Sequence, residues 1–282
     1  MTTALVLSGG GSLGAVQVGM LLALADHGVV PDLVVGASVG AVNGAYIAGR
    51  PGREGAEALA SIWTSVRRSD VFPVQPFLSL FALAGRADHL VPHDKFRRFL
   101  QRYLDYSDLE DASCPFRLVA TDVGTGEEVV LSRGPVVDAV LASVAVPGVF
   151  SPVRIGGRDL MDGAVTNYTP ISVAVEAGAE TVYVLHTGYA CALPTPPRSA
   201  LGMALHALTL IVQQRLLADV TAYRAKVRLH VAPPLCPMEV SPADFSHNSQ
   251  LITRGREETR TWLEEGMPDD DPIRNLRLHK HE

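Results

Sequence analysis

Two glycine-rich turns within the first 40 residues constrain the fold most, because each follows a short apolar run and precedes a helical pattern. The first, at residues 8–14 (SGGGSLG), follows the apolar residues 4–7, and the second, at residues 36–40 (GASVG), follows residues 33–35. A strand, a tight turn and a helix in immediate succession form the repeating unit of parallel sheets. The chain therefore begins as an α/β protein.

The rest of the chain continues this alternation. Short β-branched and apolar runs predict strands at residues 4–7, 33–35, 117–120, 128–131 and 181–185. Helical spacing predicts helices at residues 15–27, 39–48, 55–63, 95–104, 136–145 and 200–224. We expect a mostly parallel central sheet with helices on both faces, in one domain that covers residues 1–263.

Composition supports a globular domain and excludes some function classes. Hydrophobic residues make up 47% of the chain and charged residues 19%, which suffices for a sizeable core. The net charge of −6 argues against a nucleic-acid partner, which needs a basic face. Any peripheral membrane contact is then mainly apolar. The 3 cysteines are odd in number and far apart, which indicates a reduced compartment, the cytoplasm, and no cysteine metal site.

No segment of the sequence predicts a membrane span. The first apolar run lacks preceding charges and leads into a glycine turn, so it is predicted to be a strand rather than a signal peptide. The apolar residues 200–212 are shorter than the about 20 that a spanning helix needs. They suit an acyl-chain pocket, an interfacial surface or a plain core helix, and the apolar residues 71–90 suit a pocket or an interfacial surface as well. Residues 71–90, rich in Phe, Leu and Pro, form either a cap over the site or ordinary core, and the polar residues 264–282 form a tail.

Ser38 is the candidate nucleophile. It occupies the centre of G-x-S-x-G between a predicted strand and a predicted helix, where a strained turn exposes the hydroxyl. The helix that follows adds its positive N-terminal end to the site. The same pattern also fits a tight turn without chemistry, so the neighbouring motifs must decide.

The first glycine turn suits an anionic oxygen, because its N–H groups lie beside a helix N-terminus. It also matches G-x-G-x-x-G of dinucleotide sites, with Asp32 about 20 residues on. In that fold the acidic residue ends the second strand, whereas Asp32 precedes residues 33–35 and the strand end carries Ser38. A third motif, Asp162-Gly163-Ala164, follows a predicted hairpin turn at residues 156–157 and supplies a carboxylate, although Asp-Gly alone is a common turn pair.

The order of these motifs resembles that of the patatin-like phospholipases, from about residue 4 to residue 185, with further matches at residues 120–122 (ATD) and 142–152 (ASVAVPGVFSP). The resemblance implies a three-layer α/β fold, Ser38 as nucleophile and Asp162 as base of a two-residue dyad, without cofactor or metal. By the same resemblance the oxyanion donors are the N–H groups of Gly9, Gly10 and Gly11, and the supporting glycines are Gly14, Gly36, Gly40 and Gly163. Many members carry Arg or Lys where this chain has Leu13.

The function implied is serine acyl hydrolysis, the release of fatty acid from a lipid ester by a phospholipase, lysophospholipase or lipid esterase. Acyl transfer at the same site, or a silent lipid-binding regulatory module, are the alternatives. A carboxylate is a weak base, so we expect burial against apolar neighbours to raise the pKa of Asp162. His186, at the end of a predicted strand, is the candidate for a Ser-His-Asp triad instead. Asp122 is expected to cap a turn.

Overall fold

The computed structural model describes residues 1–71, 91–188, 198–238, 240–267, 273 and 276–277. Within these residues one sheet of 8 strands runs in the order β5-β6-β3-β2-β1-β7-β8, and β4 pairs with β3. The strands are β1 (Thr3–Leu7), β2 (Leu33–Ala37), β3 (Phe116–Asp122), β4 (Glu128–Leu131), β5 (Val153–Ile155), β6 (Arg158–Asp162), β7 (Thr181–Leu185) and β8 (Arg228–Val231). The five strands from β3 to β8 along this order are parallel, and β4, β5 and β6 add antiparallel pairs.

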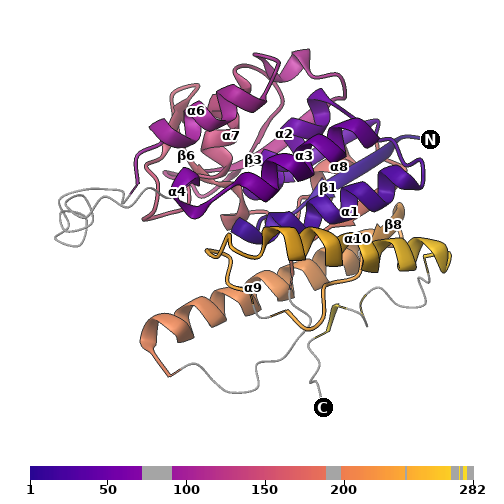
Figure 1. Cartoon of the computed structure of the whole chain (residues 1–282). Helices are drawn as coiled ribbons and strands as arrows, with labels where there is room; N and C mark the ends of the chain where they lie inside the picture. The colour runs from indigo at the N-terminus through magenta and orange to yellow at the C-terminus, as the bar shows by residue number, and fades with distance from the viewer. Residues whose placement is uncertain (72–90, 189–197, 239, 268–272, 274–275, 278–282) are drawn as a thin grey trace.

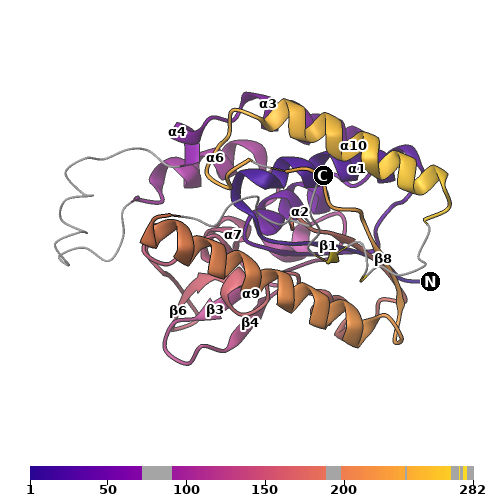
Figure 2. The same ribbon diagram turned by 90° about the horizontal axis from the view of Figure 1, so that it is seen from below.

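Helices cover both faces of the sheet (Figure 1). They are α1 (Gly14–Asp26), α2 (Val39–Gly49), α3 (Arg53–Ser65), α4 (Arg68–Val71), α6 (Asp94–Tyr103), α7 (Val136–Ser143), α8 (Ile171–Glu176), α9 (Ala200–Tyr223) and α10 (Asn248–Glu264). Alternate residues of β1 enter different cores: Leu5 and Leu7 pack with α1, α2 and α10, and Ala4 and Val6 pack with α8 and α9. Figure 2 shows α1, α3 and α10 on one side of the sheet and α9 on the other. The predicted three-layer fold with a mostly parallel sheet is confirmed.

One edge of β3 brings two distant strands end to end. Val119 pairs with Ala37 at the end of β2, and the next residue, Ala120, pairs with Asp162 at the end of β6. Both β3 residues also pair with β4, so β4 must lie on the opposite edge, and β2 and β6 share one edge. Asp162 therefore lies directly beyond the end of β2, where Ser38 begins the turn.

Six helices and strands of the structure have no counterpart among the predicted ranges: β5, β6, β8, α4, α8 and α10. The hairpin turn expected at residues 156–157 lies between β5 and β6. The strands of the β5–β6 hairpin carry charged, exposed residues such as Arg154 and Arg158, which hid their strand pattern. In contrast, α10 has a clear signal, because Leu251, Ile252 and Trp262 are buried on one face of a charged helix.

The remaining segment predictions have mixed outcomes. On α9, Met203, Leu208 and Ile211 are 48%, 56% and 64% exposed, so this part of the helix is not plain core. The predicted cap at residues 71–90 falls outside the described residues from residue 72 on, as does most of the predicted tail at 264–282. Among the helices that the structure describes, none combines the length and apolar character needed to cross a bilayer.

Candidate active site

Ser38 lies on a sharp turn between β2 and α2. Its backbone has φ 54° and ψ −125°, a conformation rare for residues other than glycine. A Cβ on Gly36 would lie 2.4 Å from the carbonyl oxygen of Gly40, and a Cβ on Gly40 would lie 2.2 Å from that of Leu7. Both glycines are therefore required by the close approach of strand and helix. The turn is a strained elbow that presents the serine hydroxyl.

A buried serine fixes the backbone of this elbow. The N–H of Ser38 donates to Oγ of Ser143 at 3.0 Å, and that hydroxyl donates to the carbonyl of Val119 at 2.6 Å. Ser143 therefore connects the elbow to β3. It lies within the resembling stretch 142–152, but its contact with Ser38 was not predicted.

The predicted nucleophile and base meet in the structure. Ser38 Oγ donates to Oδ2 of Asp162 at 2.7 Å, while Oδ1 accepts from the N–H of Ala164 at 2.8 Å. Thr121 Oγ1 donates to the carbonyl of Asp162 at 2.9 Å, and among the described residues no charged group acts on the Asp162 side chain. A carboxylate held in this way faces the serine in one orientation.

Burial controls the acidity of this carboxyl group. Asp162 is only 3% exposed, and burial raises its pKa from 3.8 to about 6, although the hydrogen bonds from Ser38 and Ala164 oppose the rise. Such a carboxylate is ionised at neutral pH and is a stronger base than a solvated aspartate. The expected rise in the pKa of Asp162 agrees with this direction.

The first glycine turn leads from β1 into the short 3-10 helix η1 (Gly11–Leu13) and then α1. Gly10 and Gly11 have φ of 146° and 60°. The N–H of Gly9 already donates to the carbonyl of Tyr168 at 3.0 Å, whereas the N–H groups of Gly10 and Gly11 have no partner in the part of the chain described. Of the three predicted oxyanion donors, two are thus available. Gly11 and Ser38 line the same cavity.

The other two supporting glycines also lie at close contacts. A Cβ on Gly14 would lie 2.4 Å from Cγ2 of Val39, and one on Gly163 would lie 2.0 Å from the carbonyl of Val119. These glycines let α1 approach α2, and the Asp162 turn approach β3. A substitution at either would push the parts of the site apart.

A buried polar chain behind the site was missed in the sequence. Trp63 Nε1 donates to Asn43 at 2.8 Å, and Asn43 Nδ2 donates to Gln17 at 2.9 Å. Gln17 Nε2 in turn donates to the carbonyls of Ser8 and Leu185. Gln17 and Asn43 are polar residues within apolar stretches of α1 and α2, and that isolation is the signal that could have found them.

The competing candidates have other partners. His186 is 1% exposed, its Nε2 donates to the carbonyl of Ala232, and its Nδ1 accepts from the N–H of Gly188, both at 3.0 Å. Burial lowers the pKa of His186 to about 4, so its ring is neutral. Asp122 accepts from two backbone N–H groups of its own turn, as expected for a cap. Asp32 accepts from the N–H of Thr3 at the opposite end of β1 from the glycine turn, which excludes the dinucleotide arrangement.

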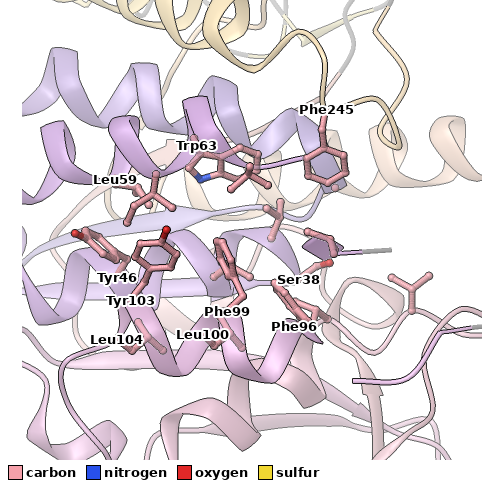
Figure 3. Close-up of a pocket in the computed structure, with 18 of the residues that line it drawn as sticks. Ser38, Tyr46, Leu59, Trp63, Phe96, Phe99, Leu100, Tyr103, Leu104 and Phe245 are labelled. Carbon is pink, nitrogen blue, oxygen red and sulfur yellow. The ribbon is translucent and has the colours of Figure 1, made fainter. Parts of the chain in front are cut away.

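An apolar cavity extends from Ser38 between α2, α3 and α6 (Figure 3). Figure 3 shows Phe96 near Ser38 and Tyr46, Tyr103 and Leu104 on the side of the cavity away from the serine. The described lining contains no charged residue and none of the described residues of α9. Its main walls are Val39, Val42, Leu59, Ile62, Trp63, Val66, Phe99, Leu100, Val144 and Phe245.

Comparison with known proteins identifies the family. A family model described as patatin-like phospholipase matches residues 5–175, more than half of the chain. The chain belongs to the patatin-like phospholipase family. The match includes Ser38, Asp162 and the glycine turn but ends before His186.

The chain spans only a small part of the length of the curated relatives that it matches. The mouse patatin-like phospholipase domain-containing protein 6 is 33% identical over 193 residues, which cover 66% of this chain and 14% of that protein. An uncharacterized NTE family protein of Mycobacterium tuberculosis is 32% identical over 172 residues, or 60% of this chain and 27% of that protein. Among solved structures, VipD from Legionella pneumophila aligns with a TM-score of 0.48 and 14% identity, covering 100% of this chain and 71% of VipD.

Proposed function

We propose that the protein is a serine acyl hydrolase that cleaves lipid esters with a Ser38–Asp162 dyad. The observation that carries the proposal is the 2.7 Å hydrogen bond from Ser38 Oγ to a buried carboxylate, at one end of an apolar cavity. The family match over residues 5–175 supports a lipid substrate.

The reaction starts when Asp162 Oδ2 accepts the proton of Ser38 Oγ and the oxygen attacks the ester carbonyl carbon. The N–H groups of Gly10 and Gly11 and the N-terminal end of α2 stabilise the oxyanion that forms. Asp162 then donates the proton to the leaving alkoxide, which departs and leaves an acyl-serine. Asp162 then takes a proton from a water molecule as its oxygen attacks the acyl-serine. The carboxyl group returns this proton to Ser38 Oγ as the bond to the serine breaks, which releases the fatty acid and restores the dyad.

The cavity is proposed to hold the acyl chain. An alkyl chain needs an apolar wall without charges, and the lining has this character over the whole distance from Ser38 to Tyr46 and Tyr103. The polar headgroup then remains at the serine end. The described part of α9 contributes no residue to this cavity.

The exposed residues of α9 are proposed to contact the lipid surface that presents the substrate. Leu208 and Ile211 are three positions apart and so share one helix face, and Met203 lies eight positions before Ile211. Their exposed apolar area favours an interfacial contact. Co-sedimentation with phosphatidylcholine vesicles should fall in Leu208→Asp and Ile211→Asp, while hydrolysis of a soluble short-chain ester stays unchanged.

The decisive experiment combines probe labelling with a lipid panel. Wild type should react with a fluorophosphonate probe and release fatty acid, Ser38→Ala should do neither, and Asp162→Asn should lose turnover. Asp122→Asn is the matched control, because Asp122 also lies at the end of β3 but accepts backbone N–H groups of its own turn, and it should keep both labelling and turnover. An unlabelled wild type would favour the lipid-binding module, and transfer of the acyl group to an added alcohol would favour the acyltransferase.

A further inference from the structure

We propose that Thr187, with Tyr168 and Ser8, is a positioning residue that aims the Gly10 N–H at the oxyanion. The proposal rests on the proposed function, since it concerns how that reaction gains its oxyanion donor. We call the hydroxyl groups of these three residues the Gly9 clamp, because two of them donate to the carbonyl of Gly9 and the Tyr168 hydroxyl binds one of those two.

The contacts of the clamp are well defined. Thr187 Oγ1 donates to the carbonyl of Gly9 at 2.5 Å, and Ser8 Oγ donates to the same oxygen at 3.0 Å. The Tyr168 hydroxyl lies 2.8 Å from Thr187 Oγ1, and it must be the donor because the one hydrogen of Thr187 is already used. The N–H of Thr187 donates to Ser8 Oγ at 3.0 Å, which closes the network.

Because the peptide bond is planar, the hydrogen bonds to the Gly9 carbonyl also fix the direction of the Gly10 N–H. In the trans peptide between Gly9 and Gly10, the carbonyl oxygen and the N–H hydrogen point in opposite directions. Fixing the Gly9 carbonyl toward Thr187 therefore points the Gly10 N–H the other way, out of the network. This N–H is one of the two without a partner in the described residues.

The loop cannot hold this orientation by itself. Gly10 has φ 146°, a conformation that glycine adopts readily but leaves as readily, and a Cβ there would lie 2.1 Å from Thr187 Oγ1. Ser8 and Thr187 are 0% and 1% exposed, so their hydrogen bonds compete with little water. Leu13 brings no charge to the loop. The clamp supplies the rigidity that the three glycines lack.

Sheet register explains why these residues meet. Leu7 of β1 pairs with Leu185 of β7, so the residues that follow, Gly9 and Thr187, leave the sheet side by side. Tyr168 lies on the chain segment that follows Asp162, and its carbonyl accepts from the Gly9 N–H at 3.0 Å. Gly9 is thus held at both its N–H and its carbonyl.

The test compares Thr187→Val, which keeps the shape but removes the hydroxyl, with Thr187→Ser, which keeps the hydroxyl. Substrates are a p-nitrophenyl ester and its thiono analogue, whose C=S sulfur accepts hydrogen bonds poorly. Losing one oxyanion donor costs about 10²–10³ in kcat, so misaiming one should lower kcat of Thr187→Val about 10- to 100-fold with KM little changed. The rate ratio of oxygen ester to thiono ester should fall as well, and Thr187→Ser should restore both quantities.

Thr259→Val is the matched control, since Thr259 is a fully buried threonine of α10 outside the network. It should change neither kcat nor the ratio. Unchanged kcat and ratio in Thr187→Val, or equal losses in Thr187→Ser, would overturn the clamp while leaving the dyad in place. A wild type inactive on every ester would overturn the proposed function itself. Should Thr187→Val not fold, Tyr168→Phe removes the next hydroxyl and must show a smaller loss of the same kind.

Discussion

Replacing Asp162 with Asn should abolish turnover and make the protein more stable at alkaline pH. The pKa of this buried carboxyl group is raised by burial from 3.8 to about 6. A pKa difference of about 2 corresponds to about 3 kcal/mol, since one pKa unit equals about 1.4 kcal/mol. The folded state favours the protonated acid, so this contribution to stability is complete below pH 3.8 and is lost as the pH rises through 6. Asparagine has no such dependence.

The assay is urea unfolding of both proteins at several pH values. The stability gain of Asp162→Asn over wild type should grow by about 2 kcal/mol between about pH 4.5 and about pH 8, because the other titrating groups are common to both proteins and cancel. Asp122→Asn is a control, since Asp122 accepts two backbone hydrogen bonds and lies 3.8 Å from Arg158. It should not gain stability at pH 8. A constant difference between wild type and Asp162→Asn across this range would refute the reasoning.

Three further outcomes follow from the site. Because Asp162 must be ionised to act as base, kcat/KM should rise with pH with a midpoint near 6, and a flat profile between about pH 5 and 7 would contradict this role. His186→Ala should lose about 2–4 kcal/mol of unfolding free energy but keep fluorophosphonate labelling of Ser38, because both of its ring nitrogens bind backbone groups. Tyr103→Ala should shift the preferred ester toward longer acyl chains in a p-nitrophenyl ester series, because it opens the cavity at the side away from the serine; an unchanged profile would remove the acyl chain from this cavity.

The elements around the first two motifs could be predicted because local chemistry dictates them. Short apolar runs next to obligatory glycines leave few alternatives, and β1, β2, α1 and α2 lie within two residues of their predicted bounds. The family resemblance carried by the order of motifs also singled out Ser38 and Asp162 as candidate site residues. In the structure Ser38 Oγ lies 2.7 Å from Oδ2 of Asp162.

The parts that escaped prediction depend on contacts between distant segments. Nothing local in Gln17 or Thr187 indicates that each reaches the backbone of the glycine turn, because the partner comes from another strand or helix. The hydrogen bond that occupies the Gly9 N–H could not be predicted for the same reason, because its acceptor, the carbonyl of Tyr168, is 159 positions away in the sequence. Sequence patterns report which residues are buried and how the chain turns, but not which buried groups become partners.

Strand order explains why His186 cannot join Ser38 and Asp162 in a triad. Along the sheet the order is β3, β2, β1, β7, and Ser38 follows β2 while His186 follows β7. Since neighbouring strands are about 4.8 Å apart, β1 separates the serine from the histidine by about 10 Å, too far for a hydrogen bond. The glycine turn follows β1 and so lies next to the serine, and β6 places Asp162 beyond the end of β2. A histidine at the end of β7 therefore adjoins the glycine turn instead of Ser38, and there its ring binds backbone groups.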